Sequence, residues 1–589
     1  MTDARPGTRS QTFHLYMIKP SHYDDDGYVI QWFRSDIPSN TLAALNGIAL
    51  DLIEREVLGG DVEIKLHAID EINKRIRPER IIRKIKGAGG RGLVLLVGVQ
   101  SNQYPRALDI GRTLRAGGVQ VCIGGFHVSG SQTMLPGVQP EIQEAMDAGI
   151  SIFTGEAEGR LGQVLSDAYD NALKPYYDHV TDLPGMEGVP IPFLSKARIK
   201  RTKSFRSSFD SGRGCPFECS FCTIINVQGR KSRYRTGDDI EKILRENLAQ
   251  GVWRFFITDD NFARNKNWEA IFDRIIAVRE ETGIKIKLMI QVDTLCHKIP
   301  NFIDKAARAG VNRVFIGLEN INPDNLAAAK KRQNRITEYR AMLQDWRRTR
   351  AMIICGYIIG FPADTQQRVL RDIEILKREL PIDMLEFFCL TPLPGSQDHQ
   401  ELVARGVDLE PDLNKYDSEH VCTDHPNMSR QEFLQTYHMA WDTFYTDEHI
   451  ETLMRRQAAM GKKARRITMN ACWLYGVPTY EKVHPLQGGL LRFKARKDRR
   501  PTMPRESALA FYPRFIWQSL VTNLRFALLY LKYYRIERRV EKDPAKKSYT
   551  DLAIKPVQLE ELDELEMFTA EPSAQQVVEK ACKRLKNRA

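Results

Sequence analysis

The feature that most constrains the fold is an alternation of short apolar segments with longer amphipathic ones, which runs through residues 62–156 and again through 205–390. Continuous apolar runs such as residues 92–100 (GLVLLVGVQ) are typical of strands buried on both faces of a parallel sheet. The segments between them show the periodicity of helices. Strands joined by crossover helices form parallel sheets that helices cover. The alternation therefore predicts an α/β protein.

The two series differ in length, and this difference predicts two architectures. The first is expected to place strands at 62–68, 92–100, 119–125 and 150–156, and helices at 41–58, 72–87, 104–116 and 138–148. The second is expected to place strands at 205–210, 253–258, 285–291, 312–318, 353–359 and 384–390, and helices at 237–250, 266–282, 300–309, 336–349 and 365–379. We predict an N-terminal doubly wound, Rossmann-like domain, then a (β/α)6 partial TIM barrel, and a mostly helical region after it.

Three domains are expected from these changes of pattern. Four prolines between 175 and 192 form a connector that ends the first series. The expected domains are residues 1–195, 196–400 and 401–589, with residues 1–40 polar and irregular. The first residues lack the apolar stretch of a secretion signal, and no uncharged apolar run reaches about 18 residues. We therefore expect a cytoplasmic protein.

Three of the ten cysteines occur within eight residues, directly after the first strand of the second series. Cys215, Cys219 and Cys222 have the spacing C-x3-C-x2-C, and the residues before them are rich in glycine. Three thiolates can hold a [4Fe-4S] cluster and leave one iron open, which favours chemistry at that iron. The alternatives are a zinc site or unrelated thiols. Zinc would want a fourth ligand at regular spacing, and the nearest downstream histidine is His297.

The segment SGRGCPFECSFC at 211–222 resembles the cysteine signature of the radical S-adenosylmethionine (radical SAM) superfamily. The resemblance implies that the open iron chelates the amino and carboxylate groups of S-adenosylmethionine. One electron, from an external donor of the flavodoxin or ferredoxin type, would cleave the sulfonium. The resulting 5′-deoxyadenosyl radical would abstract a hydrogen atom. Cys215, Cys219 and Cys222 would then be both metal ligands and catalytic residues.

Further motifs of this superfamily lie where the predicted strands of the second series end. The residues that the resemblance assigns to S-adenosylmethionine are Asp259, Asp260, Gln291, Glu319, Gly356 and Gly360. Residues 257–262 would hold the methionine amino group, chiefly through backbone carbonyls, and Glu319 would bind ribose hydroxyls. The glycines would let the backbone approach the adenine. The alternatives are a helix N-cap for the aspartates and a structural ion pair for Glu319.

The first series resembles the cobalamin-binding domain that precedes the barrel in one class of these enzymes, which contains methylases and oxidative-cyclase-like enzymes. The residues assigned to cobalamin lie in loops after parallel strands, where open sheets bind ligands: Ser101, Tyr104, Gly124, Gly125, His127 and Glu156. The glycines would let a corrin ring lie close to the backbone. The D-x-H-x-x-G motif that places a histidine on cobalt is absent, so cobalamin is expected to bind base-off. The alternatives are a hydrogen-bonded turn residue for His127 and a sheet without cofactor.

Positive charge is concentrated toward the end of the chain. The whole chain has a net charge of +12, and residues 455–547 contain 23 Lys and Arg against 6 Asp and Glu. Within them, residues 515–534 are largely apolar and carry only Arg525 and Lys532. This pattern fits peripheral association at the inner membrane face, and it fits equally a helix packed on the barrel. Nucleic acid is not expected as a partner, because the aromatic residues do not interleave with the charges.

Together these features predict a cobalamin-dependent radical SAM enzyme. Within the class that the chain resembles, the expected reaction is methylation of an unactivated carbon through a 5′-deoxyadenosyl radical and methylcobalamin. The C-terminal region favours an apolar small molecule, such as a lipid or isoprenoid, as substrate. The alternative on the same fold is a non-methylating radical oxidative cyclase or rearrangement enzyme. The alternative of another class is a cobalamin or iron–sulfur sensor, against which the barrel motifs argue.

Overall fold

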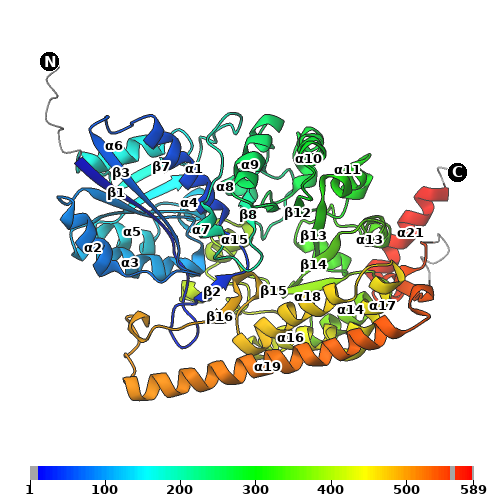
Figure 1. The fold of residues 1–589 in the computed structure, drawn as a ribbon. Helices are drawn as coiled ribbons and strands as arrows, with labels where there is room; N and C mark the ends of the chain where they lie inside the picture. Colours follow the sequence, from blue (N-terminus) through cyan, green and yellow to red (C-terminus); the bar gives the residue numbers. More distant parts are fainter. Residues whose placement is uncertain (1–10, 558–563, 587–589) are drawn as a thin grey trace.

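The computed structural model describes residues 11–557 and 564–586. They form two parallel sheets, each with its own covering helices, and a group of C-terminal helices along one edge of the molecule (Figure 1). This arrangement confirms the predicted α/β class with a doubly wound domain, a partial barrel and a helical C-terminal region.

The first sheet is parallel throughout, with strand order β3-β1-β4-β5-β6-β7. Its strands are β1 (Gln11–Lys19), β3 (Val62–Asp70), β4 (Gly92–Leu96), β5 (Gln120–Gly124), β6 (Ser151–Gly155) and β7 (Tyr176–His179). One face packs on α1 (Asn40–Glu54) and α6 (Leu161–Tyr169). The other packs on α2 (Pro78–Gly87), α3 (Tyr104–Ala116) and α5 (Pro140–Asp147). Helices on both faces make the sheet doubly wound.

The expectation that residues 1–40 are irregular is wrong over β1. This strand lies between β3 and β4, and its residues from Phe13 to Ile18 are all buried. A strand covered on both faces shows no alternation of apolar and polar residues. The polar His14 and Lys19 interrupt the apolar run and conceal the strand in the sequence.

The second sheet is also parallel, with strand order β15-β14-β13-β12-β11-β8. Its strands are β8 (Ser207–Phe209), β11 (Arg254–Ile257), β12 (Lys287–Val292), β13 (Val311–Glu319), β14 (Met352–Ile359) and β15 (Met384–Cys389). The helices between them are α9 (Gly237–Ala249), α10 (Trp268–Thr282), α11 (Phe302–Ala309), α13 (Tyr339–Arg347) and α14 (Gln366–Glu379). Because β8 does not pair with β15, the sheet is a partial barrel.

A short antiparallel pair joins the two ends of the chain. Strand β2 (Trp32–Ser35) pairs with β16 (Gly489–Arg492), and the Trp32 indole N–H donates to the carbonyl of Gln487 at 2.9 Å. The N-terminal extension therefore packs on the C-terminal region as well as on its own sheet. The domain limits at 195 and 400 remain predictions.

The C-terminal region is helical, as expected, and ends in long packed helices. They are α16 (Arg430–Phe444), α17 (Asp447–Ala459), α18 (Arg465–Gly476), α19 (Ala508–Lys542) and α21 (Pro572–Lys586). The side chain of Ser507 caps α19 by accepting from the N–H of Ala510. Pro513 lies inside the helix, where it has no N–H to donate to the carbonyl of Leu509. Helices α17 and α18 pack against α19. Within the described ranges, no helix is long and apolar enough to cross a membrane.

Candidate functional site

The cysteine loop connects the end of the first barrel strand to a short helix. It lies between β9 (Gly212–Arg213) and α8 (Ile224–Val227). The N–H of Cys215 donates to the carbonyl of Gly229 at 3.2 Å, and that of Cys222 to the carbonyl of Cys219 at 3.1 Å. Gly214 has φ +89°, and a Cβ there would lie 2.4 Å from the carbonyl oxygen of Lys231. Backbone hydrogen bonds and this glycine therefore help to fix the loop.

The environment of the thiols fits an iron–sulfur cluster. All three cysteines are free, and burial raises the pKa of Cys215 to about 11 and that of Cys222 to about 12, with a further contribution from the charge of Asp260. Thiols bind metal as thiolates, so buried thiols of this kind need the positive charge of a metal group to ionise. In the described ranges, no three His, Cys, Asp or Glu side chains converge on one ion position. Cluster ligands need not converge, because each binds a different iron.

Two residues that sequence analysis did not identify lie beside these thiols. The amide nitrogen of Gln333 donates to the Sγ of Cys219 at 3.3 Å. The ammonium of Lys331 pairs with Glu319 and lies 5.6 Å from the ring centre of Phe221, the residue before Cys222. Both side chains are buried. They belong to the segment after the short helix α12 (Pro323–Ala328), which carries no motif, so nothing in the sequence marked them.

Glu319 ends β13 in an unusual backbone conformation. Its φ is +64°, and the register of β13 against β14 shifts between Gly317 and Glu319. The side chain folds back so that a Cβ on Gly317 would lie 2.5 Å from its carboxylate. A non-glycine residue held in this region is often found at functional sites. In this structure the carboxylate of Glu319 forms an ion pair with Lys331.

Asp259 and Asp260 follow β11 and differ in their surroundings. Asp259 is buried and accepts hydrogen bonds from the N–H of Ser211 at 2.6 Å, the hydroxyl of Ser211 at 2.8 Å and the amide of Asn265 at 3.0 Å. Its carboxylate thus fixes the approach to the cysteine loop. Asp260 is exposed. Gln291 donates to the carbonyl oxygen of Asp259 at 3.3 Å, which joins the ends of β11 and β12.

Gly356 and Gly360 lie on β14 and directly after it, against aromatic side chains. A Cβ on Gly356 would lie 2.9 Å from the ring of Phe315, and one on Gly360 would lie 2.2 Å from the ring of Phe433 in α16. Gly360 also has φ +110°. The fold therefore requires both glycines for packing, whether or not a nucleotide approaches them.

Arg213, two residues before Cys215, joins the two sheets. Its guanidinium lies 2.6 Å from Glu156, 2.6 Å from Glu158 and 2.7 Å from Asp210. Arg233 also pairs with Glu156, at 2.5 Å. Glu156 and Glu158 follow β6 in the first domain, so this buried cluster fixes the cysteine loop against the N-terminal sheet. Glu156 was predicted as a cobalamin residue, and the structure places it between two arginines.

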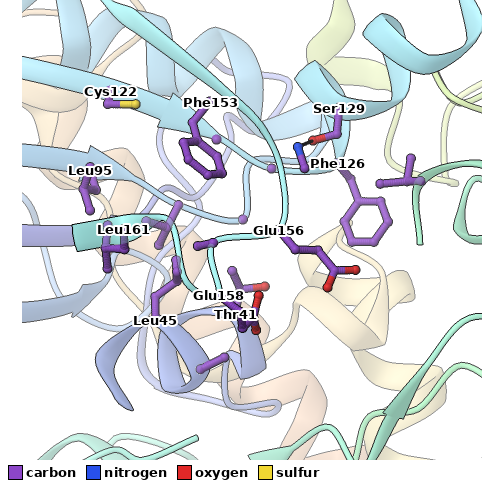
Figure 2. Close-up of a pocket in the computed structure, with 18 of the residues that line it drawn as sticks. Thr41, Leu45, Leu95, Cys122, Phe126, Ser129, Phe153, Glu156, Glu158 and Leu161 are labelled. Atoms are coloured by element: carbon purple, nitrogen blue, oxygen red, sulfur yellow. Dashed lines mark hydrogen bonds between the residues drawn. The ribbon is translucent and has the colours of Figure 1, made fainter. Parts of the chain in front are cut away.

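A cavity of about 170 Å³ opens where β4, β5 and β6 end (Figure 2). Leu45, Leu95, Phe153 and Leu161 supply much of its apolar wall, and Glu156 and Glu158 lie at one side. The second domain contributes Arg213, Val227 and Gln228. Gly124 and Gly125 also line it. An apolar cavity of this size accommodates an aromatic ring.

The remaining residues predicted for cobalamin lie together outside this cavity. His127 is buried, with Nδ1 3.2 Å from the Ser101 hydroxyl, Nε2 3.5 Å from Glu141 and its ring 4.4 Å from that of Tyr104. The Tyr104 hydroxyl donates to the Glu141 carbonyl at 2.8 Å. Gly125, which lines the cavity, cannot carry a side chain without a steric clash, because a Cβ there would lie 2.1 Å from the backbone nitrogen of Val99.

Comparison with known families assigns the second domain. Residues 210–376 match the radical SAM superfamily. The resemblance read from the cysteine loop is thereby confirmed, and these residues form a radical SAM domain. The cofactors of this domain are a [4Fe-4S] cluster and S-adenosylmethionine.

Relatives extend the similarity beyond this domain. The bacteriochlorophyllide d C-8(2)-methyltransferase of Chlorobaculum tepidum is 28% identical over 348 residues, which is 55% of this chain and 72% of that protein. The hopanoid C-2 methylase of Rhodopseudomonas palustris is 23% identical over 251 residues, 41% of this chain and 47% of that protein. The solved structure of the cobalamin-dependent S-adenosylmethionine radical enzyme OxsB covers 96% of this chain and 83% of its own, with a TM-score of 0.50 and 14% identity. The last likeness concerns the fold.

Proposed function

We propose that the chain is a cobalamin-dependent radical SAM methyltransferase that methylates an unactivated carbon of an apolar small molecule. The observation that carries this proposal is the position of the cysteine loop beside the cavity of the N-terminal sheet. Arg213 precedes the first cysteine and contacts both carboxylates of the cavity wall. A reaction that uses two cofactors on one substrate needs both at a single site, held in a fixed relation.

The cysteine loop would hold the cluster, and the residues around it would position S-adenosylmethionine. Cys215, Cys219 and Cys222 are the thiolate ligands in this proposal. Asp260 is exposed and directly follows Asp259, the buried residue that anchors the loop. With the cluster bound, S-adenosylmethionine supplies the radical that activates the substrate. Lys331 and Gln333 would hold Glu319 and the Cys219 sulfur in place.

The cavity would receive the nucleotide base of cobalamin. Its wall is largely apolar and its size suits an aromatic base. No histidine lines it, and His127 is enclosed by Ser101, Tyr104 and Glu141. Both observations support binding with the base away from cobalt and without a protein histidine. Cobalamin would supply the methyl-carrying centre next to the cysteine loop.

The substrate class and the electron donor complete the proposal. The names of the two relatives state that one acts on bacteriochlorophyllide d and the other on hopanoids, both of which contain large apolar ring systems. These names support an apolar substrate for this chain. A flavodoxin- or ferredoxin-type protein would supply the electron that starts each turnover.

A product count tests the proposal. Reconstituted full-length protein is incubated with S-adenosylmethionine, a reductant and a panel of apolar substrates that includes a hopanoid and a bacteriochlorophyllide. A methyltransferase yields one 5′-deoxyadenosine and one S-adenosylhomocysteine for each methylated product, because two molecules of S-adenosylmethionine serve different purposes. 5′-Deoxyadenosine with product but without S-adenosylhomocysteine would point to the cyclase or rearrangement alternative. Intact S-adenosylmethionine under all conditions would favour a sensor.

A further inference from the structure

Helix α19 presents a continuous apolar stripe on its outer face. The stripe consists of Leu509, Ile516, Leu520, Leu524, Leu528 and Leu531, which follow one another at steps of seven, four, four, four and three residues. These steps place them on one face of a helix, along about 33 Å of its axis. All are exposed, Leu509 at 88% and Leu520 at 61%. A stripe of this length on an outer helix marks an interaction surface.

The opposite face of the same helix is buried in the protein over the second half of the helix. Leu529, Tyr533, Ile536 and Val540 are buried, and α19 packs on α17 and α18. In Figure 1 the helix runs along the edge of the molecule, with α16, α17 and α18 on its side toward the barrel. The two readings of the sequence, an interfacial helix and a packed helix, are therefore compatible, because each describes one face.

Cations without partners lie at both ends of the stripe. At the first end, Arg77, Lys497, Arg505 and Tyr512 line one hollow, and Arg80 lines the adjoining one. At the other end, Arg535, Arg538 and Lys542 continue the outer face of α19 and are exposed. Throughout the described ranges, none of these seven cations forms an ion pair with a carboxylate.

We propose that this face of α19 docks on an anionic lipid surface, with the apolar stripe in the interface and the cations at the headgroups. An amphipathic helix with flanking Lys and Arg binds membranes in this way. Trp517, 68% exposed, and Tyr512 supply the aromatic rings that favour the interface. The helix lies on the surface, in agreement with the absence of a spanning helix from the described ranges.

Charge disfavours a second copy of the chain as the occupant. Symmetric pairing of two α19 helices in antiparallel orientation would set Arg505 against Arg538 and Lys542 of the other copy. Parallel pairing would set each cationic end against itself. Like charges at an interface are unfavourable, whereas an anionic lipid surface neutralises both ends at once. The apolar stripe between the ends disfavours nucleic acid.

Sedimentation with vesicles tests this proposal, using the full chain and vesicles of phosphatidylcholine with or without phosphatidylglycerol. The wild type should bind anionic vesicles, less so at high salt. The variant Trp517→Gln/Leu520→Gln/Leu524→Gln should bind both kinds of vesicle more than about 100-fold more weakly. The variant Arg80→Gln/Lys497→Gln/Arg505→Gln should lose on the order of 100-fold in affinity for anionic vesicles and nothing in affinity for neutral ones.

Two matched controls separate docking from general surface effects. Lys242→Gln/Lys266→Gln/Lys285→Gln removes the same charge from exposed lysines without ion pairs, and Leu50→Gln/Val138→Gln/Val403→Gln removes exposed apolar side chains elsewhere. Both should bind like the wild type, and all variants should keep its Tm, because every changed side chain is exposed. Equal binding of the wild type and the Trp517 triple variant would overturn the proposal. So would a wild-type dimer in light scattering that this variant converts to monomer, or capture of RNA in place of vesicles.

Discussion

The guanidinium of Arg213 lies 2.6 Å from the carboxylate of Glu156, and this contact connects the two sheets. Glu156 is buried and the Arg213 side chain is 10% exposed, and Glu158 and Asp210 share the same guanidinium. Cys215 follows two residues later on the same strand-to-loop connection. The relative position of the cysteine loop and the cavity is therefore held by this arginine, together with Arg233, which also pairs with Glu156.

Replacing Arg213 should strongly destabilise the protein. The variant Arg213→Met removes one cation from three carboxylates, leaves Glu158 without its ion-pair partner, and leaves Glu156 with Arg233 and Asp210 with Arg235. Breaking a buried pair in this way costs about 3–5 kcal/mol of the free energy of unfolding. Urea unfolding at pH 7 measures this loss, and the exposed Arg230→Met is the control. Arg213 holds the pKa of Asp210 at about 2 and lowers that of Glu158. The difference in free energy of unfolding between the wild type and Arg213→Met should therefore be fully present above pH 4 and decrease as the pH falls toward 2. A loss below 1 kcal/mol would show that the cluster is not a main connection between the sheets.

Replacing the three cysteines should abolish cluster binding. The variant Cys215→Ala/Cys219→Ala/Cys222→Ala removes each thiolate from a different iron. After anaerobic reconstitution it should contain almost no iron and form no 5′-deoxyadenosine. Cys472→Ala, at a free cysteine in α18, should retain both. A triple variant that still bound about four irons and cleaved S-adenosylmethionine would contradict the assignment.

Gln333 and Lys331 should tune the cluster potential. A hydrogen bond donor or a cation near a ligating sulfur stabilises the reduced, more negative state. Gln333→Leu and Lys331→Met should therefore make the reduction potential more negative, on the order of tens of millivolts. Redox titration followed by electron paramagnetic resonance measures the shift. Arg332→Met, at the exposed residue between them, is the control. Unchanged potentials in both variants would rule out this influence on the cluster.

Filling the cavity should weaken cobalamin binding. Ala157 lines the cavity, so Ala157→Phe occupies the space proposed for the nucleotide base. Bound cobalamin, measured by absorbance after gel filtration, should fall at least tenfold while the Tm is retained. Ala172→Phe places the same side chain at an exposed position of the same domain. Equal binding by both variants would place the base elsewhere.

Asp372 should make stability depend on pH. The Tyr357 hydroxyl donates to its carboxyl group at 2.9 Å, and burial, reinforced by Asp364, raises its pKa to about 8. The folded state thus binds a proton that the unfolded chain releases near pH 4, so stability should fall as the pH rises from 4 to 8. Asp372→Asn removes this contribution. Relative to the wild type, the free energy of unfolding of the variant should rise by up to about 1.4 kcal/mol per pH unit over that range. Urea unfolding measures this change. A pH-independent difference would contradict the assignment.

Much of the fold was predictable because its periodicity is local. The helix expected at 104–116 coincides with α3, and each strand expected in the second series is present. Strand β1 was missed because burial on both faces removes the alternation that identifies a strand, and His14 breaks the apolar run. Helix α19 was recognised from its apolar run, but which of its faces is covered depends on α17 and α18.

The site was predictable only where one segment carries the chemistry. The cysteines lie within eight residues and could be read directly. Gln333 lies 114 positions from Cys219, and Arg213 lies 57 from Glu156, so these contacts depend on how the strands assemble. Glu156 was expected in a loop after a strand, and it does follow β6, while its assignment to cobalamin stays a prediction. Its two arginine partners could not be anticipated, because no local pattern links them.

The pairing of β2 with β16 also bears on how the chain is made. Ser35 and Gly489 are adjacent in the folded protein but about 450 residues apart in synthesis order. At roughly 5–20 residues per second, a ribosome completes β16 about 20–90 seconds after β2. Trp32, buried against Gly489 in the finished molecule, is without this cover for all of that time. The two-stranded sheet that β2 begins thus stays without its second strand until the final hundred or so residues of the chain appear.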